Sequence, residues 1–470
     1  MTSLFNKIAL SIIFNFIFIM ISFSQENVDS TDVLIINKIE LIGNKITKNE
    51  IIYRELLFNV GDNVLKTELK SLITRSNENL LNTALFNFVT IKYIEDLNGI
   101  NVFIELQERW YIWPYPVLEH ADRNFSSFLK NEEWSRIDYG LFFLINNFRG
   151  RKETLILKTI FGHNNRYNMY YYKPFIDKLQ KLGFGFDIDY IQNHEIAFQI
   201  ANDELEYVKL TREYSRKTLK ISNFYTYRPR HNTDHLLNFK FTNVYLNDSV
   251  VALNNNYFFD NKSEIAFFTV GYDIDYDTRD SKIYPLNGFR AYFSALKNGL
   301  GILSDKGNFE LRSIIEENYQ FTDKFFVSTS ILGKMNINNS NSFYFLESLG
   351  CDNYIRGMEY YVSKSDNHYI SKTNLKYEII PQTNFDLKFI SSNKFSKVHY
   401  ALYINLFFDT GYANSNEVMN SKLTNEFLYS GGVGIDLVTY YDKVLRIEYS
   451  LNKFGEHGIF FHLGAPIIDD

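Results

Sequence analysis

Arg356 and Asp409 are the residues whose chemistry stands out in this chain. Arg356 lies in the loop-like run Tyr354-Ile355-Arg356-Gly357-Met358, and Asp409 lies in the strand-like run Phe407-Phe408-Asp409-Thr410-Gly411. A guanidinium partly withdrawn from water needs a strong acceptor, and a carboxylate that accepts two parallel hydrogen bonds is the best one. We therefore expect Asp409 to pair with Arg356 and to anchor the loop. The alternative is an arginine on an outer loop, surrounded by water.

The residue patterns of common enzymes and metal sites are absent from this sequence. It contains no Gly-x-Ser-x-Gly elbow, no His-Glu-x-x-His helix and no phosphate-binding loop. His231 and His235 flank an expected strand turn, which favours exposed loop histidines over a metal pair. Asp273, Asp275 and Asp277 alternate along one strand, which favours a charged stripe over a cation site. We predict no enzymatic activity, no metal and no cofactor.

The composition favours strands over helical membrane spans. The chain has 34 Tyr and 43 Phe but only 7 Pro, and charged residues make up 22% of it. Aromatic residues suit strands and the aromatic girdles of membrane barrels. The net charge of −6 provides no basic patch, so nucleic acid is not expected as a partner. The single Cys351 excludes an intramolecular disulfide and a cysteine metal site.

The N-terminus has the pattern of a secretory signal peptide. An apolar segment, Ile8 to Phe23, follows Lys7, and Ser22-Phe23-Ser24 places small residues before Gln25. We assign residues 1–24 to the signal peptide; the alternative is an uncleaved anchor, although the segment is shorter than the ~20 residues that a helical span needs. An exported chain with many strands suggests the outer membrane of a two-membrane cell, where the spanning structure is a closed barrel.

Residues 33–114 have the pattern of a small α/β domain. A strand from Val33 to Leu41 is followed by a capping box of Thr47 and Glu50 and by two segments of helical periodicity. Two further strands, Phe88 to Tyr93 and Ile100 to Leu106, flank an Asn-Gly turn, which is a strong hairpin signal. The expected order is β-α-α-β-β.

Residues 136–467 alternate between apolar and polar residues in segment after segment. In the run from Val444 to Leu451, for example, Leu, Ile and Tyr alternate with Arg, Glu and Ser. This period fits a wall between lipid and water, and a soluble antiparallel sheet is the alternative. We predict about 16 antiparallel strands. Their starts lie near Arg136, Glu153, Arg166, Gly183, Leu205, Lys217, Asp234, Glu264, Gly288, Asn308, Lys324, Tyr369, Val398, Asn425, Lys443 and Gly458. One large loop, between Ile337 and Tyr369, contains Arg356.

Two resemblances follow from these segments. The run from Leu81 to Val89, at the end of the expected second helix, resembles that of a POTRA (polypeptide-transport-associated) domain. The whole mature chain resembles the BamA/TamA superfamily of outer-membrane assembly and translocation barrels, also called the bacterial surface antigen family. The matching segments, in order, are Asp277-Thr278-Arg279-Asp280 with Pro285 and Gly288, Tyr354-Ile355-Arg356-Gly357-Met358, Phe407-Phe408-Asp409-Thr410-Gly411, and the run from Gly431 to Ile467.

The chain departs from the family pattern in four places. Met358 replaces the usual aromatic residue after Arg-Gly, and Lys376-Tyr377-Glu378 stands where the family often has Glu-Tyr-Arg. The two charges are exchanged but still share one face of the expected strand. The chain ends on Ile467-Ile468-Asp469-Asp470 instead of an aromatic residue. Only one POTRA-like segment is present, which indicates a shorter or specialised member.

The resemblance implies an outer-membrane protein that inserts or translocates other proteins without covalent chemistry. In the family the first and last strands meet at a weak seam, which here involves the strands near Arg136 and Gly458. The edge of the POTRA sheet is expected to receive clients in the periplasm by β-augmentation, and Gly458 and Gly464 to weaken the last strand.

Expected partners are outer-membrane lipids and unfolded outer-membrane or secreted clients. Periplasmic chaperones or accessory lipoproteins are further candidates. The alternative functions are a secretion pore dedicated to one partner protein and a passive structural or receptor barrel.

Overall fold

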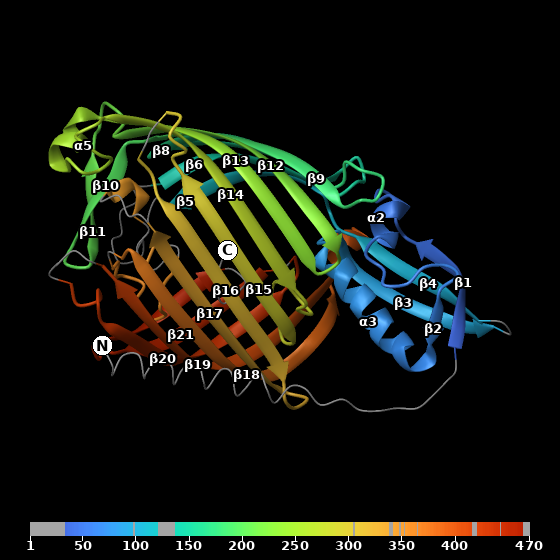
Figure 1. Ribbon diagram of the computed structural model, residues 1–470. Helices are drawn as coiled ribbons and strands as arrows, with labels where there is room; N and C mark the ends of the chain where they lie inside the picture. Colours follow the sequence, from blue (N-terminus) through green and yellow to red (C-terminus); the bar gives the residue numbers. More distant parts are fainter. Residues whose placement is uncertain are drawn as a thin grey trace.

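The computed structural model describes residues 33–96, 99–120, 137–303, 306–337, 342–346, 349–351, 353–363, 365–415, 421–441 and 443–463. The predicted signal peptide, residues 1–24, and Gly464 lie outside these ranges. Within them the chain forms a small N-terminal α/β domain and a large antiparallel sheet of 16 strands (Figure 1). Among the described residues, no helix is long and apolar enough to cross a membrane.

The N-terminal domain is a four-stranded sheet covered by two helices. The sheet order is β2-β1-β4-β3, with β1 and β4 parallel. Buried aliphatic and aromatic side chains such as Ile36, Leu69, Phe86 and Ile104 fill the space between helices and sheet. The elements are β1 (Val33–Ile42), α2 (Asn49–Tyr53), β2 (Asn63–Leu65), α3 (Lys66–Asn82), β3 (Phe86–Asp96) and β4 (Gly99–Glu108).

Two details of this domain differ from the sequence prediction. A short strand, β2, lies between the two helices, and it pairs with β1. The capping box is wrong, because α2 begins after Lys48 and has no side-chain cap. The Thr47 hydroxyl lies instead 3.1 Å from the hydroxyl of Tyr111, and it accepts a hydrogen bond from Asn147 at 2.9 Å. Thr47 is thus engaged by the segments that lead into the large sheet.

The large sheet consists of neighbours that are antiparallel throughout. Its order runs β22-β21-β20-β19-β18-β17-β16-β15-β14-β13-β12-β9-β8-β7-β6-β5. The strands are β5 (Ile112–His120), β6 (Ile137–Phe148), β7 (Glu153–Gly162), β8 (Asn164–Lys173), β9 (Leu182–Asn193), β12 (Arg216–Arg230), β13 (Thr233–Leu246), β14 (Glu264–Asp277), β15 (Gly288–Asn298), β16 (Phe309–Gln320), β17 (Phe325–Ile337), β18 (Asn367–Asp386), β19 (Lys397–Asn414), β20 (Phe427–Thr439), β21 (Lys443–Asn452) and β22 (His457–Leu463).

The predicted number of strands is right, but two assignments are wrong. The sheet begins with β5 and not near Arg136, so this strand straddles the expected end of the small domain at residue 114. The strand predicted near Leu205 is β11 (Glu204–Lys209), which pairs only with β10 (Glu195–Ala201) in a separate hairpin. β9 pairs directly with β12. Pro114 and Pro116 obscured β5, because proline is rare inside sheets.

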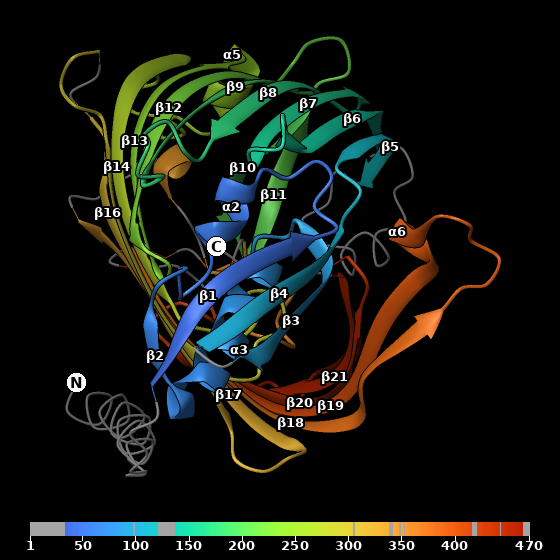
Figure 2. The same ribbon diagram turned by 90° about the vertical axis from the view of Figure 1, so that its right-hand side faces the viewer.

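The sheet curls into a ring (Figure 2). Many polar and charged side chains of its strands are buried, which places them on the inner face of the ring. Along β21 the burial alternates without a break: Leu445, Ile447 and Tyr449 are exposed, whereas Arg446 and Glu448 are buried. A soluble sheet would bury the apolar set. The alternation predicted from the sequence is therefore present, with the apolar side chains outside.

The N-terminal domain lies against one end of the ring (Figure 1). All of its contacts described here are with the turns and strand ends at that end. Arg228, near the end of β12, donates to both carboxylate oxygens of Glu55 at 2.7 and 3.0 Å. Arg75 of α3 donates to the carbonyl of Thr278 at 2.9 Å. The domain therefore covers this opening of the ring.

Candidate functional site

Arg356 sits in the loop between β17 and β18, and this loop folds back into the ring. Its guanidinium is paired with Asp409 of β19 in a bidentate geometry, with Nη2 to Oδ1 at 2.6 Å and Nε to Oδ2 at 2.8 Å. The backbone N–H of Arg356 also donates to Asp409 Oδ2, at 3.2 Å. Asp409 is fully buried and Arg356 is 3% exposed. The expected contact is thus present, in the ring interior and not on an outer loop.

Three further groups complete the surroundings of Arg356. Nη1 donates to Glu448 of β21 at 2.9 Å and to Asn374 of β18 at 2.8 Å, and the guanidinium lies 3.9 Å from the centre of the Phe407 ring. Burial lowers the pKa of Arg356, but the charges of Asp409 and Glu448 outweigh it and raise the pKa above its ordinary value. One cation therefore joins β18, β19 and β21 through a single loop residue.

Glycines give the loop its close approach to the wall. Gly357 has a φ of +81°, and a Cβ there would lie 2.9 Å from the Ser450 hydroxyl. A Cβ on Gly411 would lie 2.5 Å from the Ile355 side chain. Ile355 and Met358 are both buried in an apolar cluster with Leu428 and others, so Met358 fills the place expected for an aromatic residue.

The loop also contacts the last strand. The Tyr354 hydroxyl lies 3.0 Å from Nδ1 of His462 on β22, and the two rings are stacked with their centres 5.8 Å apart. Tyr360 packs against Phe460 with ring centres 5.7 Å apart. Glu359 of the same loop is buried, and one of its carboxylate oxygens lies 3.6 Å from His462 Nε2. Burial raises the pKa of Glu359 to about 8.

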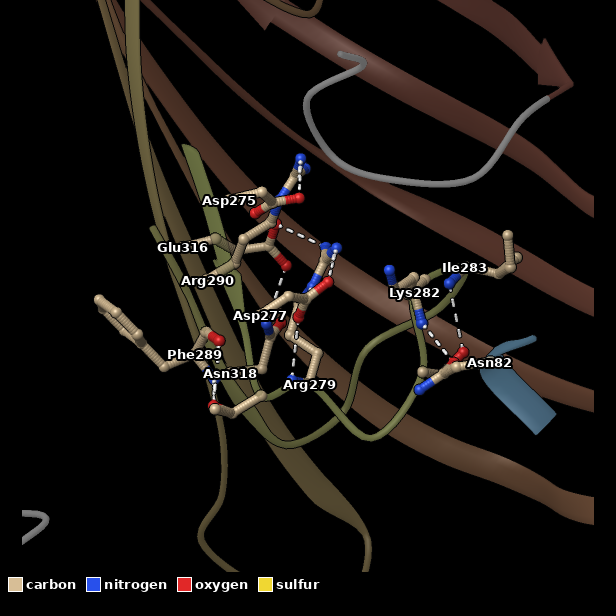
Figure 3. A network of polar contacts seen from close by, with 12 residues as sticks. Asn82, Asp275, Asp277, Arg279, Lys282, Ile283, Phe289, Arg290, Glu316 and Asn318 are labelled. Atoms are coloured by element: carbon tan, nitrogen blue, oxygen red, sulfur yellow. Dashed lines mark hydrogen bonds and ion pairs between the residues drawn. The ribbon is translucent and has the colours of Figure 1, made fainter. Parts of the chain in front are cut away.

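A second polar network contains Asp277 and Arg279, two of the residues predicted to support the site (Figure 3). Arg279 is bidentate to Asp277 at 2.9 and 3.0 Å and reaches Glu316 at 3.0 Å. Asp275 pairs with Arg290 at 3.0 Å. Asp280 accepts backbone N–H groups of its own turn. These contacts brace the end of the ring that faces the N-terminal domain.

Lys376 and Glu378 share the inner face of β18, as expected, but their described contacts do not include Arg356. Lys376 donates to the carbonyl of Pro285 at 3.0 Å and lies 4.3 Å from the centre of the Tyr284 ring. Glu378 accepts from the Tyr403 hydroxyl at 3.3 Å. Both side chains therefore belong to the end of the ring near the small domain.

The aspartates and histidines that were considered as metal sites make ordinary ion pairs and hydrogen bonds. Asp275 and Asp277 pair with arginines, and the described residues contain no cluster of three or more side chains able to hold a metal. His231 Nε2 lies 2.6 Å from the carbonyl oxygen of Arg54, so this histidine joins the small domain to the ring. His235 Nδ1 lies 2.8 Å from the hydroxyl of Tyr272. His231 is therefore an interface residue, which the sequence did not indicate.

The two ends of the sheet, β5 and β22, are not paired with each other in the described residues. The base of β5 is instead held by turns from the other side of the seam. The Trp113 ring lies 5.2 Å from that of Tyr441 and 6.2 Å from that of Phe395, centre to centre. Lys394, in α6 (Asn393–Ser396), donates to the carbonyl of Arg109 at 3.3 Å. The first strand of the sheet is therefore β5, and the strand expected to be first, near Arg136, is the second strand β6.

Comparison with known proteins gives a shared fold. No family model matches the chain, and no curated protein matches it. Among solved structures, it is similar to BamA from Haemophilus ducreyi lacking POTRA domains 1-3, with a TM-score of 0.51 and 15% identity over 92% of this chain and 84% of that one. The chain has the fold of that barrel. Two CdiB structures are also similar, from Acinetobacter baumannii (TM-score 0.48, 13% identity, 92% and 74% covered) and Escherichia coli (0.49, 9%, 94% and 93%).

Proposed function

We propose that this protein is an outer-membrane barrel of the BamA/TamA type that inserts or translocates other proteins. The N-terminal domain would be its one POTRA domain, in the periplasm. The observation that carries the proposal is the buried Arg356–Asp409 pair, which ties an inward-folded loop to the wall beside a sheet edge that has no partner strand within the described residues. A passive barrel has no evident use for an unpaired edge, because open edges leave backbone groups without partners in lipid.

The distribution of side chains supports a membrane location. Large apolar side chains are exposed around the outside of the ring, whereas charged and amide side chains are buried within it. Lipid is the natural surrounding for such an outer face. The small domain and its contacts lie at one end of the ring, and the proposal assigns that end to the periplasm. Outer-membrane lipids are accordingly the first partners.

The small domain offers a route for client proteins. β3 is an edge of its sheet, and the far half of that strand exposes Tyr93 and Ile94. An extended client segment can add to such an edge by β-augmentation. In the proposed mechanism the client passes from this edge to the seam, where the unpaired strands lower the barrier to insertion. No covalent step is involved.

Depletion of the protein followed by quantification of the outer-membrane proteome tests the proposal. Loss of many barrel proteins is the expected result, and it supports a general assembly role. Loss of one exported protein would replace this role with that of a dedicated secretion pore. An unchanged proteome would contradict the proposal and leave a passive structural or receptor barrel.

A further inference from the structure

Strands β18 and β19 run on past both of their neighbours at the end of the ring that faces the small domain. β17 pairs with β18 only as far as Tyr377, and β20 pairs with β19 only from Tyr400 onward. Beyond these points the described residues of the two strands pair with each other, up to Asp386 and Lys397, and a turn joins them. We call residues 379–399 the overhang. Figure 2 shows it in orange, extending outside the ring of strands, with α6 near its end.

The inner side of the overhang is held by the small domain. The His399 ring lies 6.1 Å from that of Phe88 on β3, centre to centre, and the ammonium of Lys397 lies 4.7 Å from the centre of the same Phe88 ring. Asn87 donates to the carbonyl of Lys394 at 3.1 Å. These contacts fix the direction of the overhang and leave its opposite side facing away from the small domain.

The opposite side of the overhang continues the outer face of the wall. The even-numbered residues of β19 from Val398 to Phe408 lie on one side of the strand, and those in the wall, such as Leu406, are exposed. Phe385 lies directly opposite Val398, so it shares that side, and it is 55% exposed. The overhang therefore extends the apolar outer surface past the end of the paired wall.

Aromatic rings mark the level at which the overhang leaves the wall. The ring of Phe325, the first residue of β17, lies 5.7 Å from that of Phe321 and 4.8 Å from that of Tyr377, centre to centre. All three side chains are exposed. Exposed aromatic residues at the end of barrel strands are typical of the boundary between lipid and water. The overhang thus begins at the level of the lipid headgroups.

The tip of the overhang presents one aromatic residue beside one cation. The N–H of Ile390 donates to the carbonyl of Leu387 at 3.0 Å, which closes a turn. Lys388 and Phe389 occupy the two central positions of this turn; Lys388 is exposed, and Phe389 is 84% exposed. Such a pair suits a membrane surface, where the ring enters the headgroup region and the ammonium stays near the phosphates.

We propose that the overhang docks on the periplasmic leaflet of the outer membrane and binds the headgroups of anionic phospholipids. It contains three lysines and one acidic residue, Asp386, whereas the whole chain has a net charge of −6. Lysines near a membrane surface are attracted by the negative potential of anionic lipids. Lipid is the occupant that fits both this charge and the continuity with the outer face of the wall. The inference rests on the membrane location in the proposed function and not on the insertion of clients.

A fluorescent label beside the tip tests this inference. In a full-length Cys351→Ser background, a nitrobenzoxadiazole label is attached to Ser391→Cys or, as the control site, to Lys70→Cys on α3; both positions are exposed. The protein is reconstituted in phosphatidylcholine vesicles with or without phosphatidylglycerol, which contain a lipid with a spin-labelled headgroup as quencher. We expect strong quenching at 391 in the vesicles with phosphatidylglycerol, weaker quenching there without it, and little quenching at 70 in either.

Substitutions at the tip identify the groups responsible. With the label at 391, Lys388→Gln should lower the ratio of docked to free overhang about fivefold in phosphatidylglycerol vesicles and change it little in their absence. Phe389→Ser should lower this ratio in both kinds of vesicle. Lys70→Gln, which removes an exposed lysine from the small domain, is the matched control and should leave the ratio unchanged. Migration in unheated gels checks that each barrel is folded.

The outcomes separate this inference from the proposed function. Equal quenching in both kinds of vesicle, or no quenching at 391 in a folded and inserted barrel, would overturn the inference and leave the insertion function standing. A label at 391 that is shielded only after a periplasmic protein fraction is added would also overturn it, because the overhang would then dock on a protein. Docking as expected in a protein that inserts no client would support the inference and contradict the insertion function alone. A protein that enters neither kind of vesicle would contradict both.

Discussion

At the scale of single residues, Arg356 is the side chain on which the interior site depends. Its loss would leave Asp409 and Glu448 buried beside each other without their shared cation. Breaking one side of a buried pair typically costs about 3–5 kcal/mol. We expect the loop to leave the wall before the barrel unfolds, because the backbone hydrogen bonds between the strands do not involve the Arg356 side chain.

We therefore expect Arg356→Ala to release the loop and to lower client insertion at least tenfold, while the barrel stays folded. The loop is followed by limited proteolysis from the outer side, and the barrel by its altered migration in unheated gels. Lys324→Ala, which removes an exposed cation from a turn, is the matched control and should behave as wild type. Full insertion activity in Arg356→Ala would argue against a role for the loop.

Glu359 gives the loop a dependence on pH. Burial raises the pKa of Glu359 to about 8 from its ordinary 4.5. The negative charge of Glu448 also raises this pKa, whereas the positive charge of Lys372 lowers it. The docked loop therefore binds a proton more tightly than the released loop, and docking weakens as pH rises from about 4.5 to about 8. Spin-label mobility at Ser363 should rise over this range and then level off. Glu359→Gln should remove the dependence; an unchanged profile in that variant would assign it to another group.

Residue types, together with the family resemblance, indicated part of this site. Arg356 and Asp409 stand out because a loop arginine needs a carboxylate, and both were predicted. Glu448 was placed on a charged strand face but not joined to Arg356, since the sequence does not tell how far the loop reaches across the ring. Lys376 and Glu378 lie on the predicted face of β18, but nearer to the small domain than Arg356. Side-chain alternation predicts which face a residue occupies, and it does not predict which residues of other segments lie at the same level of the ring.

At the scale of elements, alternation predicted most strands and failed where two local signals competed. β5 was missed because two prolines contradict a central strand, although an edge strand tolerates them. Apolar and polar residues alternate along β10 and β11 as they do along the wall strands, but these two strands pair only with each other. A period of two identifies a half-buried strand without naming the sheet to which it belongs.

The seam between β5 and β22 leads to a prediction at this scale. In a Cys351→Ser background, disulfides that join a cysteine on β5 to one on β22 should abolish client insertion, because the edges can then no longer separate. Insertion of an unfolded barrel protein into vesicles is measured before and after reduction, and reduction should restore it.

A second disulfide controls for the chemistry. Tyr449 and Ile459 face each other across the paired strands β21 and β22. A Tyr449→Cys, Ile459→Cys pair should leave insertion intact, because those strands stay together in any case. Full activity with the β5–β22 seam locked would contradict the mechanism.

At the scale of the whole molecule, the small domain covers one opening of the ring. The order of domains was predictable from the sequence, but their docking was not, because it depends on single residues in turns. A cavity of about 650 Å³ lies between α3 and the ring wall, so the domain covers the opening without filling it. Glu55, 1% exposed, is the buried charge at this junction.

Glu55→Gln should loosen the docked domain. Burial acts to raise the pKa of Glu55, but the charges of Arg228 and Lys152 outweigh it and lower the pKa to about 2 from 4.5. The carboxylate thus stabilises docking at all pH values above about 4.5, and this contribution is lost as pH falls through 2. At neutral pH the wild-type domain should stay docked, whereas Glu55→Gln leaves the half-buried Arg228 with only Asp234, 3.6 Å away, as a charged partner. Ionic conductance in planar bilayers should rise in the variant, since the covered opening is then exposed.

Glu40→Gln, which changes an exposed carboxylate on the same domain, is the control and should conduct as the wild-type protein does. Equal conductance in all three proteins would mean that the block lies at the other end of the ring, where the hairpin of β10 and β11 reaches the segment around Lys422 through Asp203.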